Sequence, residues 1–212
     1  ACVGLGVSPN AITVASTLLT GVAAALLAAG RLSMGGWLYL FAASLDLVDG
    51  RVARAQGSST KAGAFLDSTL DRVAELLVFA GLAVHFRDTP GLYAALGAAS
   101  ASVVVSYARA RGEALGVTGE ARVGGMQRAE RVVLTGIPCA LAPIFDAIFG
   151  PHAGGLVAGS AVALLAIVTT VTAARRSHAI YRVLRGAAPE PTRTFGNVRW
   201  LDVARRRARF GR

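Results

Sequence analysis

Long apolar blocks, rather than alternating polar and apolar positions, dominate this sequence. The stretch NAITVASTLLTGVAAALLAAG (10–30) contains no charged residue, and the whole chain is 54% hydrophobic with a mean hydropathy of +0.54. A helix needs roughly 20 apolar residues to cross the hydrocarbon layer of a membrane. The pattern therefore predicts an all-α fold, that of a polytopic membrane protein.

Six helical spans are predicted. They cover about 10–30, 36–50, 60–86, 90–112, 128–149 and 155–184. Pro9 and Asn10 mark the start of the first span, because Pro is favoured at helix starts and Asn caps them. Gly21, Ala25 and Ala29 recur at a spacing that allows another helix to come close.

The distribution of Lys and Arg predicts how the spans are oriented. The loops after the first, third and fifth spans hold only Arg31 and Arg87, and all the other Lys and Arg residues of the 22 fall on the opposite side. By the positive-inside rule, that basic side faces the cytoplasm. Six spans then place both termini in the cytoplasm, in a multi-pass protein of the cell membrane. The net charge of +10 is explained in this way without nucleic acid as a partner.

Two parts of the chain are predicted from these patterns. Residues 1–185 form the six-helix transmembrane domain. Residues 186–212 form a basic cytoplasmic tail with seven Arg against Glu190 and Asp202. The tail is interpreted as a solvated segment, and the alternative is a helix that lies on anionic headgroups.

The stretch DLVDGRVARAQGSSTKAGAFLDSTLD (46–71) places four carboxylates at the facing ends of the second and third spans. Asp46 and Asp49 are three residues apart and Asp67 and Asp71 are four apart, so each pair shares one helical face. The short link predicts antiparallel neighbouring helices, which lets all four carboxylates meet just inside the cytoplasmic face.

Such a cluster needs cations, and intramembrane carboxylates are functional by default. Hard oxygen ligands select Mg²⁺, Mn²⁺ or Ca²⁺. Two divalent ions close together stabilise the attacking and leaving oxygens of a phosphoryl displacement. Gly50, Gly57 and Gly63 allow the backbone to approach a bulky polar ligand closely, and Arg54 offers a bidentate fork to a phosphate.

The same stretch reads D-x2-D-G-x2-A-R-x8-G-x3-D-x3-D and resembles the signature of the CDP-alcohol phosphotransferases, integral membrane enzymes of phospholipid synthesis. The resemblance covers about Ser8 to Arg185. It implies transfer of a phosphatidyl or similar group from a CDP-linked lipid to an alcohol, with release of CMP. It also implies a homodimer embedded in membrane lipids.

The resemblance also implies a role for each matching residue. Two divalent ions per site, Mg²⁺ or alternatively Mn²⁺, would be bound by Asp46, Asp49, Asp67 and Asp71. Asp71 would act in addition as general base on the acceptor hydroxyl. The CDP moiety would be bound by Asp49, Gly50, Arg54, Thr60, Gly63 and Asp67.

Arginines at the cytoplasmic ends of the last three spans indicate the acceptor. Arg109, Arg128 and Arg176 come from three helices and can line one pocket, and a dianionic phosphate needs several charge-assisted donors. The segments SYARARGE (106–113) and RAER (128–131) resemble the actinobacterial phosphatidylinositol phosphate synthases. That resemblance implies that the three arginines bind the phosphate of inositol 1-phosphate, with CDP-diacylglycerol as the donor.

Several alternatives stay open at this point. The same transfer could use another soluble alcohol, such as glycerol 3-phosphate, serine or another polyol phosphate. A divalent-cation transporter could use the Asp cluster instead. The arginines could also be positive-inside anchors that snorkel to the headgroups.

Overall fold

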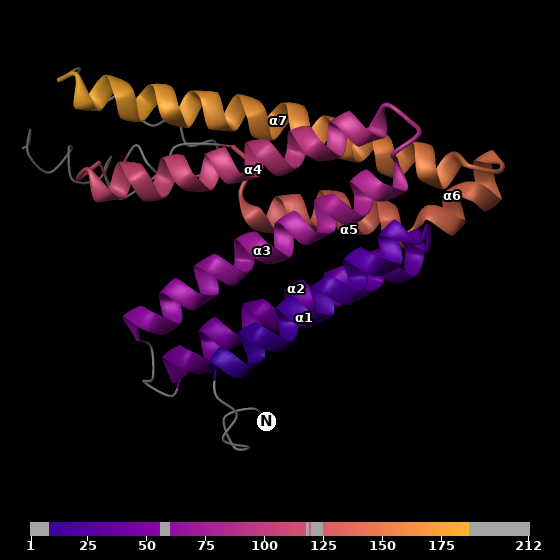
Figure 1. Cartoon of the computed structure of the whole chain (residues 1–212), viewed down its shortest axis with the longest axis horizontal. Helices are drawn as coiled ribbons and strands as arrows, with labels where there is room; N and C mark the ends of the chain where they lie inside the picture. The colour runs from indigo at the N-terminus through magenta and orange to yellow at the C-terminus, as the bar shows by residue number, and fades with distance from the viewer. Residues whose placement is uncertain (1–8, 56–59, 118, 120–124, 187–212) are drawn as a thin grey trace, which may run out of the picture.

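The structure is a computed structural model that describes residues 9–55, 60–117, 119 and 125–186, with the side chains of 47–55 outside the description. Over these residues the chain is entirely helical, as predicted, and forms seven helices (Figure 1). They are α1 (Pro9–Ala28), α2 (Leu32–Ala55), α3 (Lys61–His85), α4 (Gly91–Ala114), α5 (Arg128–Ala140), α6 (Ala142–Phe149) and α7 (Ala153–Leu184). The predicted basic tail lies outside the described residues from position 187 onward.

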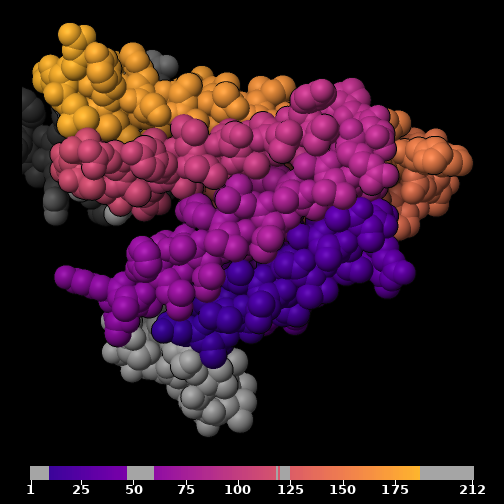
Figure 2. Space-filling model, in the orientation of Figure 1, coloured from indigo at the N-terminus to yellow at the C-terminus, as the bar shows by residue number. Residues whose placement is uncertain are grey.

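The helices form two groups joined in the middle of the molecule. α1 packs on α2 and α3, α4 packs on α7, and α5 lies between α2 and α7. Figure 1 shows the α1–α2 pair and the α4–α7 pair diverging toward one end, where α2, α4 and α7 finish and α3 begins. Figure 2 shows a broad opening between α3 and α4 at this end. The Asp stretch and the basic ends of α4 and α7 therefore gather around one opening.

Glycines allow the closest helix crossings. A Cβ on Gly81 of α3 would collide with the backbone carbonyl of Ala24 in α1, and a Cβ on Gly36 of α2 would collide with the backbone of Ala140 in α5. Backbones that come this close leave no room for a side chain between them. These two crossings fix the α1–α3 and α2–α5 distances.

The predicted stripe of small residues in α1 is not the surface that makes the close crossing. Ala25 and Ala29 are exposed, whereas Ala23, Ala24 and Leu27 are buried. α1 packs on both α2 and α3, and these two neighbours together decide which face of so Ala-rich a helix turns inward.

The second predicted span was too short. Residues 36–50 were expected to be helical, but α2 begins at Leu32 and continues through Gly50 to Ala55. Asp49 therefore lies within the helix and not at its end. A glycine inside a helix costs only about 1 kcal/mol relative to alanine, so Gly50 alone does not end α2.

The fifth predicted span, 128–149, is broken into two helices. α5 and α6 meet at Leu141 and are bent by 49° relative to each other. Pro138 lies inside α5 and Pro143 in the first turn of α6. Proline has no backbone N–H and its ring clashes with the preceding turn, which explains why the helix breaks here.

The outer surface of the helices is apolar. Large apolar side chains are exposed on the long helices, among them Leu18, Trp37, Tyr93, Leu156 and Ile167. By length and composition α1, α4 and α7 can each cross a membrane, and the bent α5–α6 pair would be a fourth span. α2 and α3 do not meet this criterion, and both carry several charged residues of the Asp stretch.

The α1–α3 crossing gives a testable prediction. We expect Gly81→Ala to lower the free energy of unfolding by about 1–3 kcal/mol, because overpacking forces α3 away from α1. Gly155→Ala is the matched control, since nothing lies within 4 Å of a Cβ at that helical position. Thermal unfolding of the protein in detergent measures both variants. Equal melting temperatures for the two would contradict the assignment of Gly81 to the crossing.

Candidate active site

Three carboxylates from two helices converge at the opening. Asp46 of α2 and Asp67 and Asp71 of α3 each place a carboxylate oxygen within 4.8 Å of the others. Oxygen ligands of a hard cation lie about 2.0–2.6 Å from it, so ligands of one ion are up to about 5 Å apart. The three side chains fit the binding of a divalent cation.

Arg128, the first residue of α5, bridges two of these carboxylates. Its Nη1 donates a hydrogen bond to Oδ2 of Asp46 and lies 2.6 Å from Oδ1 of Asp71. The side chains of Asp46 and Asp71 are only 9% and 15% exposed. The guanidinium therefore supplies positive charge to two carboxylates that water reaches poorly.

The start of α3 brings polar groups beside the cluster. Thr60 caps the helix, because its Oγ1 accepts a hydrogen bond of 3.0 Å from the backbone N–H of Gly63. A Cβ at Gly63 would lie 3.2 Å from that oxygen and 3.3 Å from Oδ1 of Asn10 in α1. Because Gly63 has no side chain, the start of α3 can lie this close to the start of α1.

A pocket of about 630 Å³ opens next to the carboxylates. The predicted acceptor residues Arg109 of α4, Arg128 of α5 and Arg176 of α7 all line it, together with Asp71. The pocket lies between α3 and α4, where Figure 2 shows the opening. The lining of the pocket thus combines arginines from four helices, because Arg72 of α3 also lines it, with one carboxylate of the cluster.

Two of these arginines are held in place by neighbours. The buried Arg176 donates a hydrogen bond of 3.0 Å from Nη1 to the carbonyl of Val105 in α4. Arg109 forms an ion pair of 3.2 Å with Glu113, one turn further along α4. Both contacts orient the arginines along the wall that α4 and α7 share.

The structure describes only some of the predicted site residues of α2. The side chains of Asp49 and Arg54 and the surroundings of Gly50 lie outside the described part of the structure, so the predicted roles of these residues stay predictions. The roles predicted for the other site residues also stay predictions. The structure brings Asp46, Asp67 and Asp71 together, and it places Asp71 with the three predicted acceptor arginines around one pocket.

The sequence interpretation gave no role to an ion pair beside the pocket. Glu75 of α3 accepts two hydrogen bonds from Arg131 of α5, and both side chains are buried. Glu75 follows Asp71 by four residues, and Arg131 follows Arg128 by three. Helical periodicity therefore places each of them on the same face as a predicted site residue.

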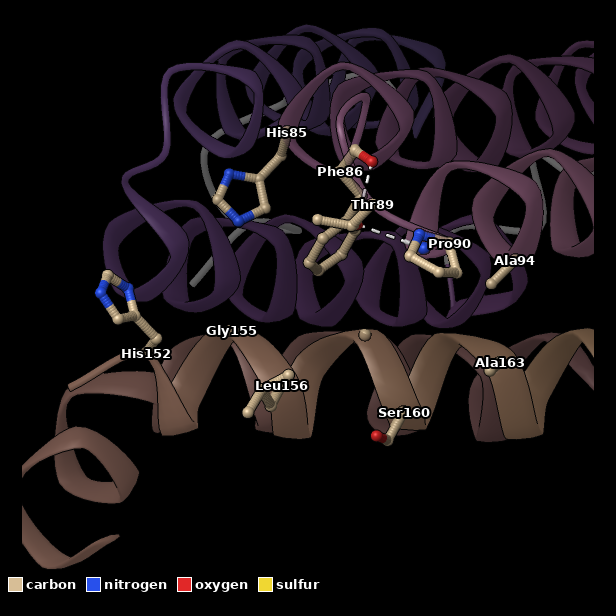
Figure 3. Close-up of a pocket in the computed structure, with 12 residues that line it drawn as sticks. His85, Phe86, Thr89, Pro90, Ala94, His152, Gly155, Leu156, Ser160 and Ala163 are labelled. Carbon is tan, nitrogen blue, oxygen red and sulfur yellow. Dashed lines mark hydrogen bonds between the residues drawn. The ribbon is translucent and has the colours of Figure 1, made fainter. Parts of the chain in front are cut away.

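A second pocket, of about 650 Å³, lies where α3 ends and α7 begins (Figure 3). His85 and His152 lie at the same end of it, and its other lining residues are mainly small or apolar. No Asp, Glu, Lys or Arg is among the residues that line this pocket. Among the described residues it therefore lacks the carboxylates and arginines that line the first pocket.

Comparison with known proteins identifies the family. The profile of the CDP-alcohol phosphatidyltransferase family matches residues 6–173. The phosphatidylinositol phosphate synthase of Mycobacterium tuberculosis (strain ATCC 25618 / H37Rv) is 35% identical over 184 residues, which cover 84% of this chain and 81% of the relative. The enzyme of the same name from Corynebacterium glutamicum is 40% identical over 137 residues, 62% of each chain.

Solved structures agree with this match. The crystal structure of Mycobacterium tuberculosis phosphatidylinositol phosphate synthase with CDP-DAG bound has a TM-score of 0.74 and 30% identity, over 85% of this chain and 89% of that one. The structure of the same enzyme with manganese and citrate also has a TM-score of 0.74, at 31% identity over 85% of each chain. The match favours a transferase over a cation transporter. From the start of α1 into α7, the chain belongs to the CDP-alcohol phosphatidyltransferase family of enzymes.

Proposed function

We propose that the chain transfers the phosphatidyl group of CDP-diacylglycerol to inositol 1-phosphate, giving phosphatidylinositol phosphate and CMP. The observation that carries this proposal is the position of Arg128. Its guanidinium contacts Asp46 and Asp71 in the carboxylate cluster. It also lines the pocket of about 630 Å³ that contains Arg109 and Arg176, which is called the arginine pocket below. Donor and acceptor must meet at one phosphorus atom, and Arg128 lies where their two sites join. The names of the relatives support the choice of acceptor.

The carboxylate cluster is the proposed metal and donor site. Two Mg²⁺ or Mn²⁺ ions would be held by Asp46, Asp49, Asp67 and Asp71; the manganese bound to the related enzyme and the carboxylate spacing support this. Bound divalent ions would offset the charge that builds up on the pyrophosphate oxygens. The proposed CDP-binding residues are Asp49, Gly50, Arg54, Thr60, Gly63 and Asp67.

The arginine pocket is the proposed acceptor site. Arg109, Arg128 and Arg176 bind the acceptor phosphate, since a dianion is stabilised by several charge-assisted hydrogen bonds. Asp71 lines the same pocket and takes the proton of the acceptor hydroxyl. The hydroxyl oxygen forms a bond to the phosphatidyl phosphorus, the bond from that phosphorus to CMP breaks, and CMP leaves with the electron pair.

The membrane arrangement belongs to the same proposal. α1 to α4, the bent α5–α6 pair and α7 make six spans, and the basic end of the bundle faces the cytoplasm with both termini and the active site. Residues 1–185 form the transmembrane domain, 186–212 the basic tail, and two copies form a homodimer. The exposed apolar side chains of the long helices and the arginines around the opening support this orientation.

An acceptor screen tests the proposed reaction. Purified protein with CDP-diacylglycerol and Mg²⁺ or Mn²⁺ should release CMP with inositol 1-phosphate, and chelation of the metal should stop the release. Inositol is the matched control, because it lacks the phosphate that the arginines bind. CMP release with glycerol 3-phosphate or serine, but not with inositol 1-phosphate, would show that the acceptor is wrong.

The role of Asp71 is tested by Asp71→Asn, which keeps the shape of the side chain and removes the base. We expect turnover to fall by about 10²–10⁴-fold, the typical contribution of general base catalysis. Asp88→Asn is the control, since that carboxylate is 84% exposed in a pair with Arg87. Full turnover in a folded Asp71→Asn protein would exclude Asp71 as the base.

The role of Arg128 is tested by Arg128→Gln. We expect the KM for inositol 1-phosphate to rise by roughly tenfold or more, because a lost charge-assisted hydrogen bond costs about 1.5–3 kcal/mol. Arg87→Gln, at an arginine that is 71% exposed, is the control and should keep the wild-type KM. An unchanged KM in Arg128→Gln would remove this residue from the acceptor site.

A further inference from the structure

The Glu75–Arg131 pair lies one helical turn from the Asp71–Arg128 pair. Nε of Arg131 lies 2.5 Å from Oε1 of Glu75, and Nη2 lies 3.2 Å from Oε2. The side chains of Arg131 and Glu75 are only 3% and 4% exposed. A two-point contact between a planar guanidinium and a carboxylate fixes orientation as well as distance. The pair therefore sets how α5 is turned relative to α3.

Arg131 also holds the residues that precede α5. Its Nη1 donates a hydrogen bond of 3.3 Å to the carbonyl of Met126. The backbone N–H of Met126 donates to Oγ1 of Thr172 in α7, at 3.4 Å. Both peptide groups of Met126 are thus held, two residues before Arg128. The chain that leads into α5 is fixed between α7 and the Glu75–Arg131 pair.

Stability alone does not explain such a pair. Removing two charges from water costs several kcal/mol for each ion, and well-packed apolar residues often stabilise a fold as well or better. Without Glu75, however, Arg131 would be an uncompensated cation in the wall of the arginine pocket. It would compete with Arg128 for Asp71, one turn away, and release the carbonyl of Met126.

We propose that Glu75 is a positioning residue for Arg128. It binds Arg131, and Arg131 in turn fixes the start of α5 through the carbonyl of Met126. Glu75 thereby acts mainly on the affinity for the phosphorylated acceptor, and much less on the affinity for the lipid donor. This inference rests on the proposed role of Arg128 in binding the acceptor phosphate.

Glu75→Gln tests the proposal, because it keeps the shape and removes the charge. We expect the KM for inositol 1-phosphate to rise by about tenfold, with the KM for CDP-diacylglycerol within about twofold of wild type. The double variant Glu75→Gln/Arg128→Gln should have nearly the same acceptor KM as Arg128→Gln, since residues that act through one another are not additive. Asp88→Asn, in an exposed ion pair at the other end of the helices, is the matched control.

Arg131→Lys is the second variant, which decides the outcome if Glu75→Gln does not fold. It keeps the positive charge but loses the two-point contact of the guanidinium with Glu75, and we expect the same selective rise in acceptor KM. The proposal would be overturned if the increases in acceptor KM of Glu75→Gln and Arg128→Gln multiplied in the double variant. It would also be overturned if the KM values of both substrates changed equally. A raised acceptor KM in Arg128→Gln with an unchanged KM in Glu75→Gln would overturn this inference alone. An unchanged KM in Arg128→Gln would instead remove Arg128 from the acceptor site and overturn that part of the proposed function, on which this inference rests.

Discussion

Ion pairs between α5 and its neighbours hold charged side chains inside the helix bundle, and the site depends on them. Arg128 meets Asp46 and Asp71, and one turn further Arg131 meets Glu75. A buried charge that loses its partner costs about 3–5 kcal/mol, so rotations of α5 that separate these groups are disfavoured. The pairing thus orients α5 relative to α2 and α3, and the same arginine that neutralises the carboxylates comes to line the arginine pocket.

α3 contributes to both the carboxylate cluster and the arginine pocket, so in the proposed function it is the helix at which the lipid-linked donor and the soluble acceptor would meet. Asp67 and Asp71 belong to the carboxylate cluster, whereas Ser68 and Arg72 line the arginine pocket together with Asp71. Asp71 is common to the two. A general base has to reach the acceptor hydroxyl while it faces the donor phosphorus, and Asp71 is the carboxylate that has this shared position.

The local patterns of the sequence predicted more of the site than of the packing. Spacings of three and four residues showed that Asp67 and Asp71 share a face, and helical periodicity holds regardless of tertiary contacts. The Glu75–Arg131 contact joins residues 56 apart in sequence, so it depends on how the whole bundle places α3 and α5 relative to each other. The prediction that Ala25 and Ala29 allow a close helix contact was wrong for a related reason. Small residues occur on more than one face of α1, and the packing of the neighbouring helices places Ala24 at the crossing. Pro138 and Pro143 were a readable signal for the break at Leu141.

The start of α5 also has an electrostatic consequence for the pocket. Because α5 begins at Arg128, the start of a helix lies at the pocket wall, and the N-terminus of a helix carries a partial positive charge of about half a unit. The side chain of Glu130 accepts a hydrogen bond of 2.8 Å from the backbone N–H of Gln127, so this N–H group just before the first turn has a partner. The helix dipole and the guanidinium of Arg128 therefore act in the same direction on an anion in the pocket. The position of this helix start therefore strengthens the field that the phosphate of the proposed acceptor would meet.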